Sequence, residues 1–337
     1  MRILWIEQGH PGLGYYDALY APLKKLGHNL TEWKPRRGGE LLNVAAKDMD
    51  VAFVSFGFFP MESGSIPKLR EYEKAASSSA TSLCGRVPLY VLLNKEYVLM
   101  SRKFEWLKAH CVTRGLTVHH HAERFANETG IPFTRIWFGV DVNKFALPGT
   151  SGDTSSGALA SHNYLYDLGF TGVIRHEQTE NWRYRIWRYA WPKLQAKGLR
   201  LFSGPRGGVH VGVAHASMNA SEYVHSMRAS KIWLSTTGPA DLVGTRYFEV
   251  MATGTTLCLC NRVENEPAIY TSLGLKDHVH VLMFDSLTHL EELVYNFTMG
   301  GPVYEAKRLA IVRRAQALVR KRFTWQHVAE RVAAALV

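Results

Sequence analysis

The sequence has few cysteines, and no stretch of it is long and apolar enough to cross a membrane. The cysteines of the 337 residues are Cys84, Cys111, Cys258 and Cys260, too few and too scattered to indicate a disulfide framework. Cys258 and Cys260 alternate within an apolar run, so we expect buried free thiols. No apolar run approaches the ~20 residues of a membrane helix, and Met1–Glu7 is too short and too soon charged for a signal peptide. These absences predict a protein of a reducing, cytoplasmic compartment.

The chain also lacks the common nucleic-acid-binding motifs, although its formal net charge is +11. It contains no zinc-finger spacing, ribonucleoprotein motif or basic heptad region. The charge therefore favours phosphate-bearing small ligands or an anionic membrane surface over nucleic acid. The densest basic cluster, Lys307–Arg322, is interpreted as the solvated face of a packed helix, with peripheral contact to an anionic membrane as the alternative.

The chain is long enough for two domains, and 46% of its residues are hydrophobic. Expected strands alternate with expected helices in both halves, which predicts parallel sheets with right-handed crossovers. The expected strands are Arg2–Gln8, Asn29–Trp33, Asp50–Phe56, Val87–Leu93, Leu116–His120, Thr134–Phe138, Gly169–Ile174, Leu199–Ser203, Lys231–Leu234, Thr256–Cys260 and Val279–Phe284. The expected helices include Tyr15–Leu26, Ile66–Ala76, Lys103–Ala109, Ala122–Thr129, Asn181–Lys197, Ser221–Ala229, Tyr304–Phe323 and Trp325–Leu336.

The stretch 229–260 is the most informative part of the sequence. It predicts a strand, a polar loop from Gly238 to Thr245, a helix from Arg246 to Ala252 that Gly254 ends, and a buried strand. Asp241, Arg246 and Glu249 then lie near the carboxyl end of a strand, where open α/β sheets bind their ligands.

This stretch resembles the donor half-site of GT-B glycosyltransferases, in the branch of the CgeB-like proteins and glycosyl transferases group 1. The resemblance rests on Arg246-Tyr247-Phe248-Glu249 followed by Ala252-Thr253-Gly254. It implies that Glu249 accepts hydrogen bonds from the ribose hydroxyls of a sugar nucleotide. A carboxylate suits this role because it offers only acceptors. Asp241 stands eight positions earlier, where many retaining members carry a second Glu.

The same resemblance implies the architecture, namely two Rossmann-like parallel-sheet domains that face a cleft, with C-terminal helices crossing back. We expect an acceptor-binding domain over 1–147, a nucleotide-sugar-binding domain over 161–320 and a terminal helix over 321–337 that packs toward the first domain. Gly139–Phe145 looks like the segment that closes the first domain, and Pro148–Ala160 has the composition of a linker.

Enzymes of this fold neutralise the leaving diphosphate with positive groups and helix amino termini. We expect Arg246 and Arg175 to contact the diphosphate, Arg183 being a weaker candidate, and Gly238 to border the donor site. No bound metal is expected, since Asp48-Met49-Asp50 precedes a strand at the end away from the cleft. The only small-molecule requirement is the nucleotide-sugar co-substrate.

The first domain should supply the acceptor site. Gly12 and Gly14 lie in a glycine-rich turn after the first strand and resemble an acceptor-binding turn; a dinucleotide site there would need a cleaner glycine pattern. Glu96 and His10 are the candidate general bases. A third group, His119–His121, follows another strand and favours a surface or supporting role over catalysis.

Together these features predict a metal-independent glycosyltransferase that moves a sugar from a nucleotide donor to a hydroxyl acceptor such as a glycan. The alternative is a non-catalytic nucleotide-sugar or glycan-binding protein of the same fold, because Asp241 replaces the family's Glu. An epimerase or phosphorylase is a third class, although no pattern for a lysine-bound pyridoxal phosphate stands out.

Overall fold

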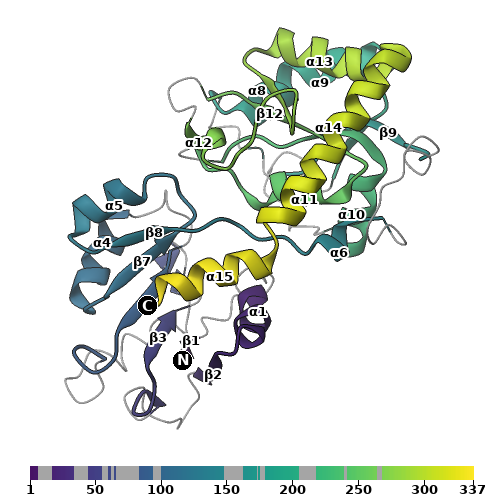
Figure 1. Cartoon of the computed structure of the whole chain (residues 1–337). Coiled ribbons are helices and arrows are strands. Elements are labelled where there is room, and N and C mark those ends of the chain that lie inside the picture. The colour runs from purple at the N-terminus through teal and green to yellow at the C-terminus, as the bar shows by residue number, and fades with distance from the viewer. Residues whose placement is uncertain are drawn as a thin grey trace. The chain divides into compact units, whose positions relative to one another are not determined.

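The structure is a computed structural model that describes residues 1–6, 17–33, 45–54, 60–61, 64–65, 83–93, 100–147, 162–172, 174, 179–204, 218–238, 241–263 and 268–337. It divides into two compact units, Met1–Gly139 with Trp325–Val337, and Val140–Thr324 (Figure 1). Each unit is built around one parallel sheet.

The first unit contains a six-stranded parallel sheet in the order β2-β1-β3-β6-β7-β8. Its strands are β1 Arg2–Ile6, β2 Asn29–Trp33, β3 Val51–Val54, β6 Leu89–Leu92, β7 Arg114–Thr117 and β8 Phe133–Arg135. Its helical elements are the 3₁₀ turn η1 Asp17–Leu19, α1 Tyr20–Lys25, α4 Met100–Ala109, α5 Ala122–Thr129 and α15 Trp325–Ala335, beside the antiparallel pair β4 Pro60–Met61 and β5 Gly64–Ser65. Every residue of β3 and β6 is buried, as expected for strands covered on both faces.

The first unit also contains a disulfide bond, which corrects our expectation about the cysteines. Cys84 and Cys111 are bonded, with their Cα atoms 5.3 Å apart. Cys84 precedes β6 and Cys111 precedes β7, and these strands are paired neighbours, so the sheet brings together two residues that are distant in sequence. This bond removes the cysteine argument for a reducing compartment. Cys258 and Cys260 are buried and free, as predicted.

The second unit contains a five-stranded parallel sheet in the order β10-β9-β11-β12-β13. Its strands are β9 Tyr166–Phe170, β10 Leu201–Ser203, β11 Ser230–Leu234, β12 Leu257–Asn261 and β13 Leu282–Phe284. Its helices are α6 Val142–Phe145, α8 Trp182–Arg185, η2 Ile186–Ala190, α9 Trp191–Ala196, α10 Ala220–Arg228, α11 Thr245–Thr253, α12 Ala268–Thr271, α13 Leu287–Met299 and α14 Gly301–Arg322. In Figure 1, α14 passes beside α11.

Several helix boundaries follow from local chemistry. Ser286 caps α13 as predicted, because its hydroxyl accepts the His289 amide at 3.1 Å. The single helix expected over Asn181–Lys197 is interrupted by the π-helical turn η2. Pro192 follows that turn; it has no amide hydrogen to continue the regular pattern, which accounts for the irregularity.

The first residues of the second unit differ from our expected boundary. Helix α6 lies in the second unit, not at the end of a first domain that reaches residue 147. Its carboxyl end is held there by Arg228 of α10, whose guanidinium donates to the carbonyl oxygens of Lys144 at 2.8 Å, Phe145 at 2.7 Å, and Ala146. Helix α15, by contrast, belongs to the first unit, where Tyr90 donates to the Leu336 carbonyl at 3.2 Å.

The basic cluster on α14 is not a uniform solvated face. Lys307, Arg314 and Lys321 are exposed, but Arg308 is completely buried. Its guanidinium binds both carboxylate oxygens of Glu305, the Thr255 carbonyl and the Tyr164 hydroxyl. Arg308 therefore stabilises the second unit internally and is removed from the candidate membrane-contacting charges. Within the described part of the chain, no helix is both long and apolar enough to span a membrane.

Candidate functional site

Small polar side chains gather at the carboxyl ends of three strands in the second sheet. Thr171 follows β9, Ser235–Thr237 follow β11, and Asn261 ends β12. All are buried. The Thr171 hydroxyl has no hydrogen-bond partner among the described residues, so it remains available to a ligand. This sheet edge is where an open α/β fold binds its ligands.

Asn261 organises the loop after β11. Its Oδ1 accepts the Thr237 amide at 2.8 Å, and its Nδ2 donates to Thr237 Oγ1 at 3.1 Å. Thr237 Oγ1 also lies 3.3 Å from Oδ1 of Asp241, and the Gly238 amide donates to the Leu242 carbonyl at 2.8 Å. Asp241 has φ of +55°, a left-handed conformation that is uncommon for non-glycine residues but that Asp adopts more readily than most. The structure thus places Gly238 and Asp241 near one another at the sheet edge.

Two arginines approach the same point beside this loop. A Cβ placed on Gly172, directly after β9, would lie 3.5 Å from Nη1 of Arg246 and 3.6 Å from Nη1 of Arg183. Arg246 comes from the first turn of α11 and Arg183 from α8, where its Nε donates to Thr236 Oγ1 at 3.0 Å. Converging guanidinium groups are suited to a diphosphate. From the sequence, Arg183 is a weaker diphosphate candidate than Arg246 and Arg175. In the structure, Arg183 and Arg246 converge on the same point.

Helix α11 supports this arrangement at both ends. No side chain caps its amino terminus at Gly244, so that end carries a partial positive charge near Arg246. Its carboxyl end is Gly254, as predicted, with φ of +68°. A Cβ at Gly254 would lie 2.2 Å from Nε2 of Gln316, which donates to the Ala252 carbonyl. The positive φ favours glycine there, and the missing side chain leaves room for Gln316, which joins α14 to α11.

Glu249 lies one turn into α11 and is buried, with 9% of its surface exposed. Its Oε2 accepts a hydrogen bond of 2.8 Å from the Tyr223 hydroxyl. Burial raises the pKa of this carboxyl, while the hydrogen bond from Tyr223 and the nearby charges of Arg246 and Lys144 act against that rise. Glu249 therefore does not form an exposed ion pair with Arg246 on the helix surface.

Several candidate residues lie outside the described residues. They are His10, Gly12, Gly14, Glu96 and Arg175, together with the expected linker Pro148–Ala160 and most of the loop after β10. The acceptor-site residues, the general bases and one diphosphate contact therefore stay predictions.

The three histidines after β7 form a turn rather than the expected continuation of the strand. His119 is buried, its ring stacks on His120 at a centroid distance of 4.2 Å, and its Nδ1 accepts the His121 amide at 3.1 Å. Their ligand nitrogens all lie within 4.8 Å of one another. The ring nitrogen of His119 that can accept is thus already used within the turn, which favours a structural or supporting role.

The Asp-x-Asp segment before β3 has a structural partner. The Asp50 carboxylate accepts the Arg2 amide at 2.7 Å and the Arg2 guanidinium at 3.0 Å, and these bonds lower the pKa of Asp50. The pair joins the beginnings of β1 and β3, at the amino end of the sheet. A role for Asp50 at the sheet's ligand-binding end is not supported by this placement.

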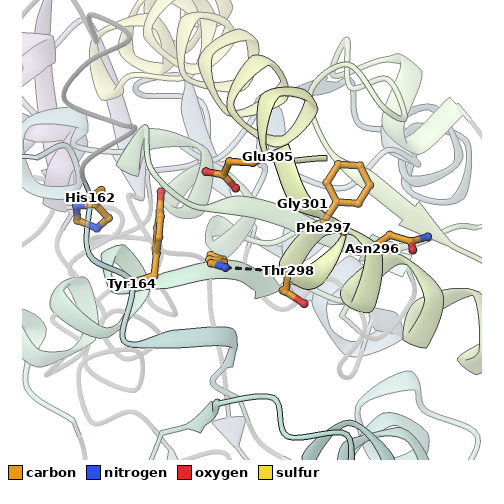
Figure 2. A pocket seen from close by; sticks show the side chains of 9 residues that line it. His162, Tyr164, Asn296, Phe297, Thr298, Gly301 and Glu305 are labelled. Atoms are coloured by element: carbon orange, nitrogen blue, oxygen red, sulfur yellow. Dashed lines mark hydrogen bonds between the residues drawn. The ribbon is translucent and has the colours of Figure 1, made fainter. Parts of the chain in front are cut away.

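A pocket of about 290 Å³ lies at the opposite, amino end of the second sheet (Figure 2). Tyr164 and His162 line one side, and Thr298 and Glu305 line another. Its charged groups are already paired, since Lys231 donates to the Thr298 carbonyl at 3.1 Å and Glu305 binds Arg308. This pocket lies apart from the polar side chains at the carboxyl ends of the strands.

Comparison with known proteins finds a family match over most of the second unit. Residues 173–334 match the family described as glycosyl transferase-like, which includes every described residue of the candidate donor site except Thr171 and Gly172. The search of curated proteins gave no significant match.

Solved structures of the same architecture span the whole chain. HepE from Anabaena, in complex with UDP and glucose, is 13% identical with a TM-score of 0.59, covering 100% of this chain and 99% of its own. A glycosyltransferase from Rickettsia africae ESF-5 is 10% identical with a TM-score of 0.61, at 99% and 97% coverage. The apo structure of OtsA is 10% identical with a TM-score of 0.58, at 100% and 99% coverage.

The two parallel-sheet units and these structural likenesses confirm the predicted GT-B fold. The chain therefore has this fold, and its residues 173–334 match the family described as glycosyl transferase-like.

Proposed function

We propose that the protein transfers a sugar from a nucleotide-sugar donor to a hydroxyl acceptor such as a glycan, without a bound metal. The observation that carries this proposal is the buried Glu249 carboxylate near Arg246, which itself converges with Arg183 on Gly172 at the carboxyl end of a parallel sheet. HepE, of the same fold, binds UDP, which supports a nucleotide donor.

In this proposal each group has a separate task. Glu249 accepts hydrogen bonds from the two ribose hydroxyls. Arg183, Arg246 and the amino terminus of α11 stabilise the negative charge that develops on the leaving diphosphate. If the reaction inverts configuration, a base in the first unit takes the acceptor proton, and Glu96 and His10 remain the candidates for it.

The central test is Glu249→Gln. The substitution keeps the size of the side chain but converts one acceptor oxygen into a donor, so one ribose hydroxyl loses its partner. Loss of a charged hydrogen bond costs about 1.5–3 kcal/mol, or roughly 10- to 150-fold in affinity. A thermal-shift panel of UDP, GDP, ADP, CDP and dTDP identifies the base first, and calorimetric titration of the selected nucleotide then measures the change.

Glu291→Gln is the matched control. Glu291 is also 9% exposed, but it lies on α13 and pairs with Lys193 at 3.2 Å, away from the site. We expect its substitution to leave nucleotide affinity unchanged. If folded Glu249→Gln protein binds the nucleotide as tightly as the parent, the donor-site assignment is wrong.

The alternative, a non-catalytic binding protein, is favoured by one observation, the shorter Asp241 in place of a second Glu. The two functions differ in product formation. A transferase releases nucleoside diphosphate when donor and acceptor are both present, and a binding protein releases none. A coupled nucleotide-release assay across glycan acceptors separates them.

Metal independence gives a further prediction. Turnover should persist in excess chelator, because the arginines and the α11 amino terminus already supply positive charge at the diphosphate. The nucleotide-release assay with and without EDTA measures this. Complete loss of turnover that manganese or magnesium restores would contradict the proposed mechanism.

A further inference from the structure

The Tyr223 hydroxyl contacts one donor-site residue of α11 and lies near the charge of the other. It donates to Oε2 of Glu249 at 2.8 Å, and the positive charge of Arg246 acts on it. Tyr223 comes from α10, so it contacts the site from a different helix. We propose that Tyr223 is a positioning residue, which aims the Glu249 carboxylate at the ribose. This inference rests on the proposed donor site.

The packing of the Tyr223 ring fixes its hydroxyl in place. The ring meets Phe145 edge-on at 6.3 Å and Trp233 edge-on at 6.2 Å. Helix α10 begins with a capping box, in which Asn219 and Glu222 satisfy each other's backbone amides. A hydroxyl held by two aromatic neighbours on a well-capped helix can orient a carboxylate without losing much entropy on binding.

The surroundings of Glu249 explain why a donor is needed there. A buried carboxylate without hydrogen bonds takes up a proton at a higher pH than an exposed one. Three groups oppose this rise in the pKa of Glu249, namely Tyr223 from α10, Arg246 from α11 and Lys144 from α6. The hydrogen bond from Tyr223 is the largest of the opposing effects. Two other elements pack on α11. Helix α14 contributes Gln316, which donates to the Ala252 carbonyl, and β12 contributes the neutral thiols of Cys258 and Cys260.

The test is Tyr223→Phe, which removes only the hydroxyl and keeps the ring contacts. We expect nucleotide affinity to fall about 10-fold at neutral pH. Without Tyr223 the pKa of Glu249 rises further, and a protonated Glu249 offers the ribose fewer acceptors. The pH below which affinity declines should therefore move upward relative to the parent.

The measurement is calorimetric titration of UDP, or of whichever nucleoside diphosphate the panel selects, between pH 5.5 and pH 9. Glu249→Gln protein supplies the pH dependence of the nucleotide itself, since position 249 cannot titrate there. Adding Tyr223→Phe to Glu249→Gln should cause less than a twofold further loss, because Tyr223 acts through Glu249. Recovery of the nucleotide affinity of Tyr223→Phe toward the parent value at high pH would support this inference.

Tyr164→Phe is the matched control. The Tyr164 hydroxyl is also buried and donates to the Thr255 carbonyl at 2.9 Å, but it lies at the other end of the sheet. Loss of the Tyr164 hydroxyl should lower the free energy of unfolding without shifting the pH dependence of nucleotide affinity. The inference is wrong if Glu249→Gln weakens binding and Tyr223→Phe changes neither affinity nor the pH profile, or if the two substitutions are additive. If Glu249→Gln itself has no effect, the donor-site proposal fails and this inference with it.

Discussion

Replacing Arg183 and Arg246 together by methionine is expected to weaken nucleoside diphosphate binding by roughly 10²- to 10⁴-fold. Both guanidiniums approach Gly172 at the carboxyl end of β9, within reach of one ligand group. Each lost charge-assisted hydrogen bond costs about 1.5–3 kcal/mol, and two such losses give about 3–6 kcal/mol. Methionine keeps much of the apolar stem of arginine, so the packing of α8 and α11 should change little.

The loss should be specific for phosphate. We expect the double variant to lose far less affinity for the parent nucleoside, which carries no phosphate, in the same titration, because Arg246 acts on the ribose only through its charge near Glu249. Arg200→Met is the control, since Arg200 pairs with Asp167 at the amino end of the sheet and should not affect either ligand. Equal weakening of nucleoside and nucleoside diphosphate would show that the arginines shape the fold and do not bind the diphosphate.

The parts of this site that the sequence predicted are those encoded locally. Arg246, Glu249 and Gly254 share one helix, and a helix with its closing glycine can be identified from neighbouring residues alone. The same is true of Asn29–Trp33 and Ala122–Thr129, whose predicted and observed bounds coincide.

The parts that the sequence did not predict depend on contacts between distant segments. Tyr223 reaches Glu249 from 26 residues away, and Cys84 reaches Cys111 because β6 and β7 pair. The assignment of α6 to the second unit depends on Arg228, more than 80 positions away. No periodicity or spacing signals such contacts, because the tertiary fold creates them.

Arg308 is the clearest example, and the stability of the second unit should depend on it. An arginine in a run of basic residues on an amphipathic helix is normally solvated. Here none of its surface is exposed, its guanidinium donates to the Thr255 carbonyl and Tyr164 hydroxyl at 2.8 Å each, and it lies over the Tyr164 ring at 4.6 Å. Its ion pair with Glu305 holds the pKa of that carboxyl below its usual range.

Arg308→Met is therefore expected to destabilise the second unit by about 2–4 kcal/mol, because the buried Thr255 carbonyl and Tyr164 hydroxyl lose a charged donor and the partly exposed Glu305 loses its ion pair. Thermal or urea unfolding monitored in that unit measures this, and Arg314→Met on the exposed side of α14 should cost less than about 0.5 kcal/mol. The pKa of Glu305 is lowered in the folded parent. Its contribution to the free energy of unfolding is therefore present above its unfolded pKa and is lost as the pH falls through its folded pKa. The free energy of unfolding of Arg308→Met should lack this loss at acid pH.

Removing both charges tests whether the cost comes from the lost pair or from the charge left behind. In Arg308→Met with Glu305→Leu, no carboxylate remains without its partner, and Tyr164 still donates to the Thr255 carbonyl. Replacement of a whole buried ion pair by apolar side chains is often neutral. The double variant should therefore recover most of the stability lost by Arg308→Met alone. Equal destabilisation of the single and double variants would mean that the guanidinium is needed for its bonds to the backbone and to Tyr164, and not for its pairing with Glu305.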